Sequence, residues 1–170
     1  MTWSPRDRVF WPILVTLLFA DCATKRLAET YLVPENTPHN VAGTVVRLTL
    51  THNSGAAMSM SLGSYSRIAF SIAAAFAIVL LVRLYRATPA TDRLRAVALA
   101  LLIGGATGNL VNRLISSRGV VDFIDIGVPS WRFWTFNVAD AGITIGAMLL
   151  ARVLWLEGSP AARNGLRTPG

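Results

Sequence analysis

Four apolar segments divide the chain, and each has the length of a membrane-spanning helix. They cover approximately residues 9–28, 66–84, 94–114 and 135–156. A helix needs about 20 apolar residues to cross the hydrocarbon core, and backbone groups in lipid must bond within their own segment. We therefore expect a mainly α membrane protein with four transmembrane helices. Asp21 and Lys25 interrupt the first segment, but they lie one helical turn apart and can pair.

The connections between these segments predict a small β-sheet. Residues 41–50 are rich in β-branched side chains with partial alternation, which indicates a strand, and residues 58–62 are its candidate partner. We expect this first connection to form a sheet that rests on the outer membrane surface. Residues 120–126, in the third connection, are also extended in character. Trp131 and Trp134 follow them, as in the aromatic belt at a membrane interface.

The composition is that of an integral membrane protein with one domain. Of the 170 residues, 53% are hydrophobic and 15% are charged, whereas a soluble domain carries about 25% charged residues. We place the domain at residues 1–157 and expect residues 158–170 to be a disordered cytoplasmic tail. The net charge of +7 is not arranged as a basic stripe with interleaved aromatic residues, so we expect no nucleic-acid partner.

The arginines indicate how the chain is oriented. Lys and Arg concentrate on the cytoplasmic side of membrane proteins. The arginines that predict cytoplasmic termini and a cytoplasmic second connection are Arg6, Arg8, Arg83, Arg86, Arg93, Arg95, Arg163 and Arg167. The first and third connections then face outward, although four further arginines lie in or beside them.

Residues 1–22 have some features of a cleavable signal peptide, because Arg6 and Arg8 precede an apolar run. Cys22 would then be a lipoprotein cysteine. The residue before such a cysteine should be small, but here it is Asp21, and three more apolar segments follow. We therefore favour an uncleaved first helix. Cys22 is the single cysteine, so it has no partner for an internal disulfide.

Two aspartates, Asp122 and Asp140, lie at the edges of apolar segments, where ionisable residues are rare and usually functional. Two carboxylates that meet can share a proton and perform acid/base chemistry. Asp140 also has a structural interpretation, since Asn137 three residues earlier makes a helix capping box. Side chains alternate along a strand, so spacing alone leaves open whether Asp122 or Asp125 faces Asp140.

The third apolar segment ends in a polar cluster. Gly104, Gly105 and Gly108 allow close helix packing in a membrane. Packing does not explain Asn109, Asn112 and Arg113, which need polar partners such as the acids of the next connection. The remaining motif, Asn53-Ser-Gly55, is by itself only a turn signal.

Other reaction classes lack their residues. The chain has no His-Glu-x-x-His motif, and its two histidines are His39 and His52, so a zinc protease is not expected. It has no Gly-x-Ser-x-Gly motif and no phosphate-binding Gly-x-x-x-x-Gly-Lys loop. We expect no metal and no cofactor.

Five blocks, taken in order, resemble the lipoprotein signal peptidase family, also called signal peptidase II. They are residues 21–25 (Asp-Cys-Ala-Thr-Lys), 53–57 (Asn-Ser-Gly-Ala-Ala), 104–113 (Gly-Gly-Ala-Thr-Gly-Asn-Leu-Val-Asn-Arg), 120–124 (Val-Val-Asp-Phe-Ile) and 136–140 (Phe-Asn-Val-Ala-Asp). One position departs from the family pattern: Asn112 replaces the usual Asp before Arg113. Because an amide does not offset the charge of Arg113, we expect that arginine to turn to Asp125 or to a lipid headgroup.

The resemblance implies that Asp122 and Asp140 are the catalytic acids of a membrane aspartic endopeptidase. It implies a substrate site formed by Asn53, Gly55, Asn109, Arg113 and Asn137, with support from Asp21, Lys25, Gly105, Gly108 and Asn112. The substrate would be a diacylglyceryl-modified prolipoprotein, cut before its lipidated cysteine. The resemblance further implies a monomer in the bacterial inner membrane, in contact with membrane lipids, with an outward-facing site inhibited by globomycin.

The alternative is a small four-span transporter or proton-conducting protein, because intramembrane acids and amides also serve ion pathways. A pathway needs polar residues across the whole membrane. Here the polar residues gather toward one side, and the middles of the second and fourth segments have little polarity. The sequence therefore favours the peptidase.

Overall fold

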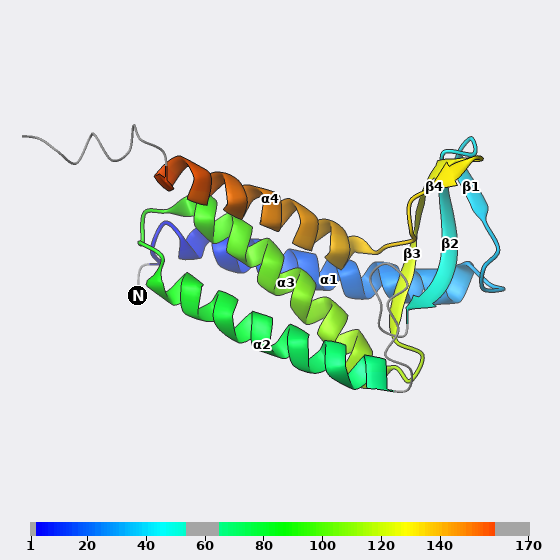
Figure 1. Ribbon diagram of the computed structural model, residues 1–170, viewed down its shortest axis with the longest axis horizontal. Helices are drawn as coiled ribbons and strands as arrows, with labels where there is room; N and C mark the ends of the chain where they lie inside the picture. The colour runs from blue at the N-terminus through cyan, green and yellow to red at the C-terminus, as the bar shows by residue number, and fades with distance from the viewer. Residues whose placement is uncertain (1–2, 54–64, 159–170) are drawn as a thin grey trace, which may run out of the picture.

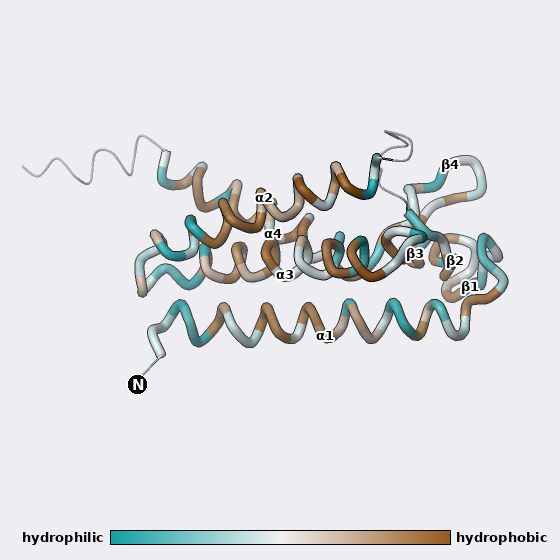
Figure 2. Tube along the Cα trace, turned by 90° about the horizontal axis from the view of Figure 1, so that it is seen from below, coloured by the Kyte–Doolittle hydropathy of each residue, from teal (hydrophilic) through white to brown (hydrophobic). Residues whose placement is uncertain are grey.

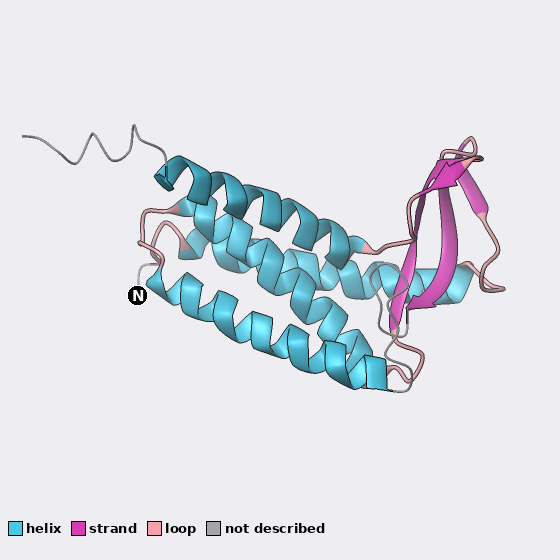
Figure 3. Ribbon diagram, in the orientation of Figure 1, coloured by secondary structure: helices cyan, strands magenta, loops and turns pink. Residues whose placement is uncertain are grey.

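The computed structural model describes residues 3–53 and 65–158, which form a bundle of helices with a sheet at one end (Figures 1 and 3). The elements in chain order are α1 (Asp7–Tyr31), β1 (His39–Ala42), β2 (Val46–Asn53), α2 (Ser66–Ala87), α3 (Arg93–Ile115), β3 (Val120–Val128), β4 (Trp131–Arg132) and α4 (Val138–Gly158). The helices coincide with the four apolar segments. Of the tail expected at residues 158–170, Gly158 is instead the last residue of α4, and residues 159–170 lie outside the described residues, as does the candidate strand at 58–62.

Helix α3 is central, because it packs against each of the other three helices. Its small residues allow this close packing. A Cβ atom on Gly105 would collide with the carbonyl oxygen of Ala139 in α4, and one on Gly108 would lie 2.6 Å from Oδ2 of Asp21 in α1. The glycines of the third apolar segment therefore have the packing role that the sequence predicted.

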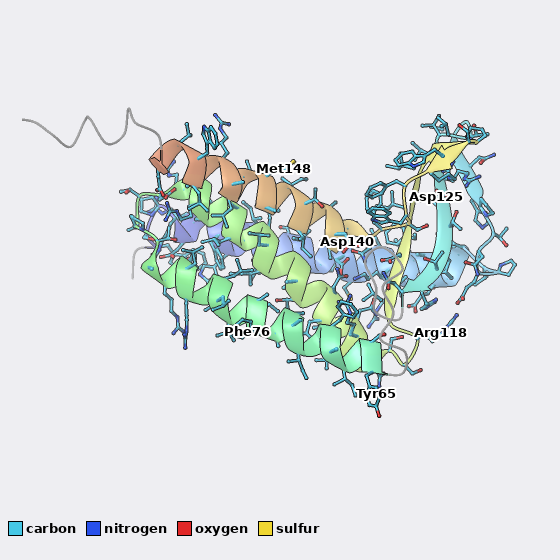
Figure 4. The ribbon with its side chains drawn as sticks, in the orientation of Figure 1. Tyr65, Phe76, Arg118, Asp125, Asp140 and Met148 are labelled. Carbon is cyan, nitrogen blue, oxygen red and sulfur yellow. The ribbon has the colours of Figure 1, made fainter. Side chains whose placement is uncertain are left out.

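Helix α3 places several small residues inside the bundle, and many large apolar side chains lie on the outside. Ala96, Ala98 and Ala100 of α3 are fully buried, whereas Phe76 of α2 and Trp155 of α4 are 65% and 80% exposed. Figure 4 shows Phe76 and Met148 on outward faces, and Figure 2 shows mainly apolar residues along the middle of the bundle. Such a surface is suited to contact with lipid.

Among the described residues, α2, α3 and α4 are long and apolar enough to cross a membrane. Helix α1 is not in this group, although it has 25 residues. Its charged side chains, including Asp21 and Lys25, lower its apolar character. The structure thus gives three candidate spans where the sequence analysis expected four.

The sheet has the order β1-β2-β3-β4, with antiparallel neighbours. The single strand predicted over residues 41–50 is instead a hairpin of β1 and β2, because the chain turns at Gly43, where φ is 55°. The described partner of β2 is β3, with Thr51 opposite Asp122. The sheet therefore joins the first and third connections, whereas the prediction drew it from the first connection and gave residues 120–126 only as extended.

Asp125 fastens three strands together. Its carboxylate accepts hydrogen bonds from Nε of Arg47 at 3.0 Å, Nε of Arg132 at 2.6 Å and Oγ1 of Thr49 at 3.1 Å. Burial acts to raise the pKa of Asp125, but the bonds from Arg132, Arg47 and Thr49 outweigh it and hold the pKa below its usual range. The carboxylate of Asp125 therefore connects β3 to β2 and β4.

Asp125→Asn is expected to lower the free energy of unfolding by about 2 kcal/mol at neutral pH, because both arginines lose their anionic partner. The ionised form carries this stabilisation, so it is present above the unfolded-state pKa of about 4 and is lost as the pH falls through the lower folded-state pKa. Thermal unfolding in detergent between pH 7 and pH 3 measures the difference. A stability difference between Asp125→Asn and wild type that stayed constant over this pH range would contradict the role of the ionised Asp125 in the sheet.

Candidate active site

The two aspartates occupy neighbouring elements at the end of the bundle that faces the sheet. Asp122 lies on β3 and is 3% exposed, and Asp140 lies in the first turn of α4. Figure 4 shows Asp140 at the sheet end of α4 and Asp125 farther out along the sheet. The charge of Asp140 acts on Asp122, whereas Asp125 is held by Arg47 and Arg132, so of the two acids that spacing left open the structure brings Asp122 together with Asp140.

Asn137 joins the two acids. Its backbone N–H donates to Oδ2 of Asp140 at 3.2 Å, and its Oδ1 accepts the N–H of Asp140 at 2.9 Å. This is the predicted capping box at the start of α4. The fully buried Asn137 also donates from Nδ2 to Oδ1 of Asp122 at 2.6 Å. One residue thus caps the helix and touches both carboxylates.

A second amide, Asn109 of α3, connects the acids to α1. Its Nδ2 donates to Oδ1 of Asp140 at 2.7 Å, and its Oδ1 accepts from Nζ of Lys25 at 2.9 Å. Lys25 also pairs with Asp21 at 2.8 Å, and Asp21 accepts the N–H of Ala139 at 3.0 Å. Three helices therefore fix the position of Asp140 through buried polar contacts.

The environment of Asp122 favours its protonated form. Burial, and next the charge of Asp140, raise the pKa of Asp122 to about 7. Hydrogen bonds from Asn137 and Asn53 and the charge of Lys25 act in the opposite direction. Two close carboxylates do not both ionise readily, so they titrate as a coupled pair. The geometry can hold one proton between two acids near neutral pH.

Of the remaining candidate residues, the structure describes Arg113 and Asn112. Arg113 interacts electrostatically with Asp140 and Asp122, whereas Asp125 binds Arg47 and Arg132. Of the two partners expected for Arg113, Asp125 was wrong, because Arg47 and Arg132 already hold that carboxylate; contact with a lipid headgroup stays a prediction. Asn112 accepts a backbone hydrogen bond from β3, and Gly55 lies outside the described residues.

Sequence reasoning missed the backbone partners of this network. The N–H of Ala139 donates to Asp21, and the N–H of Val121 donates to Asn112. Every residue except proline carries the same N–H group, so the sequence contains no signal for these contacts. The sequence did indicate the polar side chains of the network, because a polar side chain in an apolar segment needs a hydrogen-bond partner.

The polar network does not continue through the described part of the bundle. Toward the other end, Gly104 and Gly142 both approach Leu17, and Gly146 approaches Leu102. The side chain of Leu17 makes the first two contacts apolar, and Gly146 also lies close to the backbone of Ala98. Among the described residues, the network that contains Asp122 and Asp140 therefore stays at the sheet end of the bundle, separate from the polar contacts of Arg6, Asp7 and Tyr85 at the other end. This separation favours a reaction centre over a path for ions.

The comparisons with known proteins agree with this arrangement. The family model described as signal peptidase (SPase) II matches residues 13–156. A lipoprotein signal peptidase of Photorhabdus laumondii is 40% identical over 147 residues, covering 84% of each chain, and one of Francisella tularensis subsp. novicida is 33% identical over 144 residues, covering 83% of this chain and 88% of the relative.

Two solved structures have the same fold. Both are bacterial membrane enzymes determined by the in meso method. The 2.3 Å structure is 27% identical, with a TM-score of 0.82 and 94% coverage of each chain. The 1.9 Å structure is 28% identical, with a TM-score of 0.80 and coverage of 94% of this chain and 99% of that one.

Proposed function

This chain belongs to the signal peptidase II family, and we propose that Asp122 and Asp140 are its catalytic residues. It is a bacterial membrane aspartic peptidase that removes signal peptides from lipoproteins. The observation that carries the proposal is the contact of Asn137 with both carboxylates, at 2.6 Å to Asp122 and 3.2 Å to Asp140. Asn53, Gly55, Asn109, Arg113 and Asn137 would line the substrate site.

In the proposed mechanism, Asp140 accepts a proton from a water molecule that attacks the scissile carbonyl carbon. Its position at a helix N-terminus stabilises the negative charge that this role requires. Asp122 holds the other proton and donates a hydrogen bond to the carbonyl oxygen. As the tetrahedral intermediate collapses, the carbon–nitrogen bond breaks and the leaving amine receives a proton from the pair. Buried, preoriented donors and acids are most effective where water is excluded.

The rate should depend on pH through the proton on Asp122. Because the pKa of Asp122 is raised to about 7, kcat/KM is expected to fall as the pH rises above this value and the proton is lost. The pKa observed in a rate profile belongs to the coupled pair of aspartates. A pH–rate profile of the purified enzyme from pH 5 to pH 9 measures the fall. A rate that kept rising through pH 9 would contradict a role for a protonated acid.

We infer that α1 is a fourth membrane span. Its 25 residues extend about 37 Å at 1.5 Å per residue, more than the roughly 30 Å of hydrocarbon. Its buried charges, Asp21 and Lys25, neutralise one another at 2.8 Å. Four spans would place both termini in the cytoplasm, and the sheet and the aspartate pair at the outer face of the inner membrane.

This placement suits a substrate with a diacylglyceryl group on its cysteine. Such chains partition into the bilayer with about 0.8 kcal/mol per buried CH₂, which would hold the bond before the cysteine near the membrane surface. We propose that the enzyme acts as a monomer among membrane lipids and that globomycin occupies the same site.

The requirement for lipid can be tested with matched substrates. Purified enzyme is expected to cleave a diacylglyceryl-modified prolipoprotein at least about 100-fold faster than the same protein without the lipid, because remote binding energy contributes to catalysis. Product formation in lipid vesicles measures both rates, and globomycin should abolish the faster one. Equal rates for the two substrates would contradict this substrate assignment.

A further inference from the structure

Asn112 lies three residues after Asn109 on α3, so both amides project from the same side of the helix. They contact different catalytic segments. Asn109 donates to Asp140 at the start of α4, at 2.7 Å. Asn112 accepts the N–H of Val121 on β3, at 2.8 Å. The end of α3 is therefore connected to both elements that carry the aspartate pair.

The contact with Val121 is close to the reacting groups. Val121 is fully buried and immediately precedes Asp122. Its carbonyl oxygen accepts from Nδ2 of Asn137 at 3.2 Å, and the same nitrogen donates to Asp122 at 2.6 Å. The backbone of Val121 is thus held by α3 through its N–H and by the start of α4 through its C=O.

We propose that Asn112 is a positioning residue, which sets the place of Asp122 relative to Asp140 by holding the N–H of Val121. This role rests on the proposed function of the aspartate pair. Asn112 touches neither aspartate in the described contacts, so it acts through the strand. A buried N–H that lost this acceptor would have to find another or move.

The chemistry of the contact explains why an amide serves here. The side chain of Asn112 needs only one acceptor oxygen, and a carboxylate at this position could accept the same bond. The departure from the family's usual Asp therefore preserves the contact with β3. It also avoids a third negative charge close to Asp122 and Asp140.

The test compares Asn112→Ala with Asn112→Asp, and with Ser117→Ala as an exposed control in the connection that follows α3. Asn112→Ala is expected to lower kcat by about 10- to 100-fold, the effect of a small misplacement of a catalytic group, with little change in KM. The high-pH limb of its rate profile should move to lower pH, because Asp122 becomes less buried. Asn112→Asp should stay within about threefold of wild type, since it keeps the acceptor.

A merely structural role would have a different result. Asn112→Ala would then lose activity by the same factor at every pH, in proportion to the unfolded fraction, and this outcome would overturn the proposal. An Ala variant with wild-type kcat and an unshifted pH limb would also overturn it.

Hydrogen exchange at the amide of Val121 decides the inference without any assay of activity. Exchange is expected to be slow in wild type and in Asn112→Asp and faster in Asn112→Ala; equal exchange in all three proteins would overturn the positioning role. Asp140→Asn separates the catalytic role of the aspartate pair from the positioning role of Asn112. If wild type and Asp140→Asn cleaved equally, the proposed function would fail, whereas the exchange rates would still report the contact of Asn112.

Discussion

Asp122→Asn and Asp140→Asn are each expected to reduce turnover of a lipidated prolipoprotein by at least about 1,000-fold, within the range found when acid–base groups are removed. Asn has nearly the shape of Asp and keeps one acceptor oxygen, so Asn137 can still donate to position 122 and Asn109 to position 140. At position 140 the backbone N–H of Asn137 loses its acceptor, because the amide has a single oxygen. Neither variant can accept a proton from water or supply one at the mutated position. Initial rates of the purified variants measure the loss.

Asp125→Asn is the matched control for these variants. It removes a buried carboxylate three residues from Asp122, but one that binds Arg47 and Arg132. At neutral pH, where it remains folded, it should retain turnover within a few-fold of wild type. Loss of activity in Asp125→Asn equal to that in Asp122→Asn would show that the choice between these two acids was wrong.

Lys25→Met is expected to have the largest effect on stability, about 3–5 kcal/mol, because it leaves the carboxylate of Asp21 buried without its partner. It should also reduce turnover by about 100-fold. The ammonium group of Lys25 fixes the orientation of Asn109 by donating to its Oδ1, and this orientation directs Nδ2 toward Asp140. Chemical denaturation in detergent and kinetics at saturating substrate measure the two effects.

The double variant Asp21→Asn/Lys25→Met separates stability from activity. It removes both charges, and Asn at position 21 can still accept the N–H of Ala139, so most of the lost stability should return. Turnover should stay low, since Oδ1 of Asn109 has lost the ammonium donor of Lys25 and keeps, among the described contacts, only the bond from Nδ2 of Asn137 at 3.1 Å. Arg118→Met, which breaks an exposed pair with Glu35, should cost less than about 1 kcal/mol. Full recovery of turnover in the double variant would argue against the role of Lys25.

The parts of the fold that depend on neighbours in sequence were predictable. Apolar length predicted the four helices, and the spacing of Asn137 and Asp140 predicted the capping box that begins α4. The glycines of α3 predicted close packing, which Gly105 and Gly108 provide. In each case a local pattern has one main physical explanation.

Contacts between distant segments were not predictable in the same way. The pairing of β2 with β3 depends on tertiary structure, so the sheet was predicted from the first connection, and residues 120–126 were predicted only to be extended. The turn at Gly43 was hidden within a β-branched run. Alternation along β3 did not decide between Asp122 and Asp125; the family resemblance favoured Asp122, and in the structure Asn137 bonds to that residue. The charges of α1 also leave its apolar character below that of the other three helices.

Cleavage of a diacylglyceryl-modified prolipoprotein by purified wild-type protein, beside Asp122→Asn and Asp140→Asn, tests the central claim most directly. Mass spectrometry of the products locates the cut, and thermal unfolding verifies that each variant is folded. We predict that wild type cuts immediately before the lipidated cysteine and that neither folded variant does. Near-normal cleavage by either variant, or a cut at another bond, would contradict catalysis by Asp122 and Asp140.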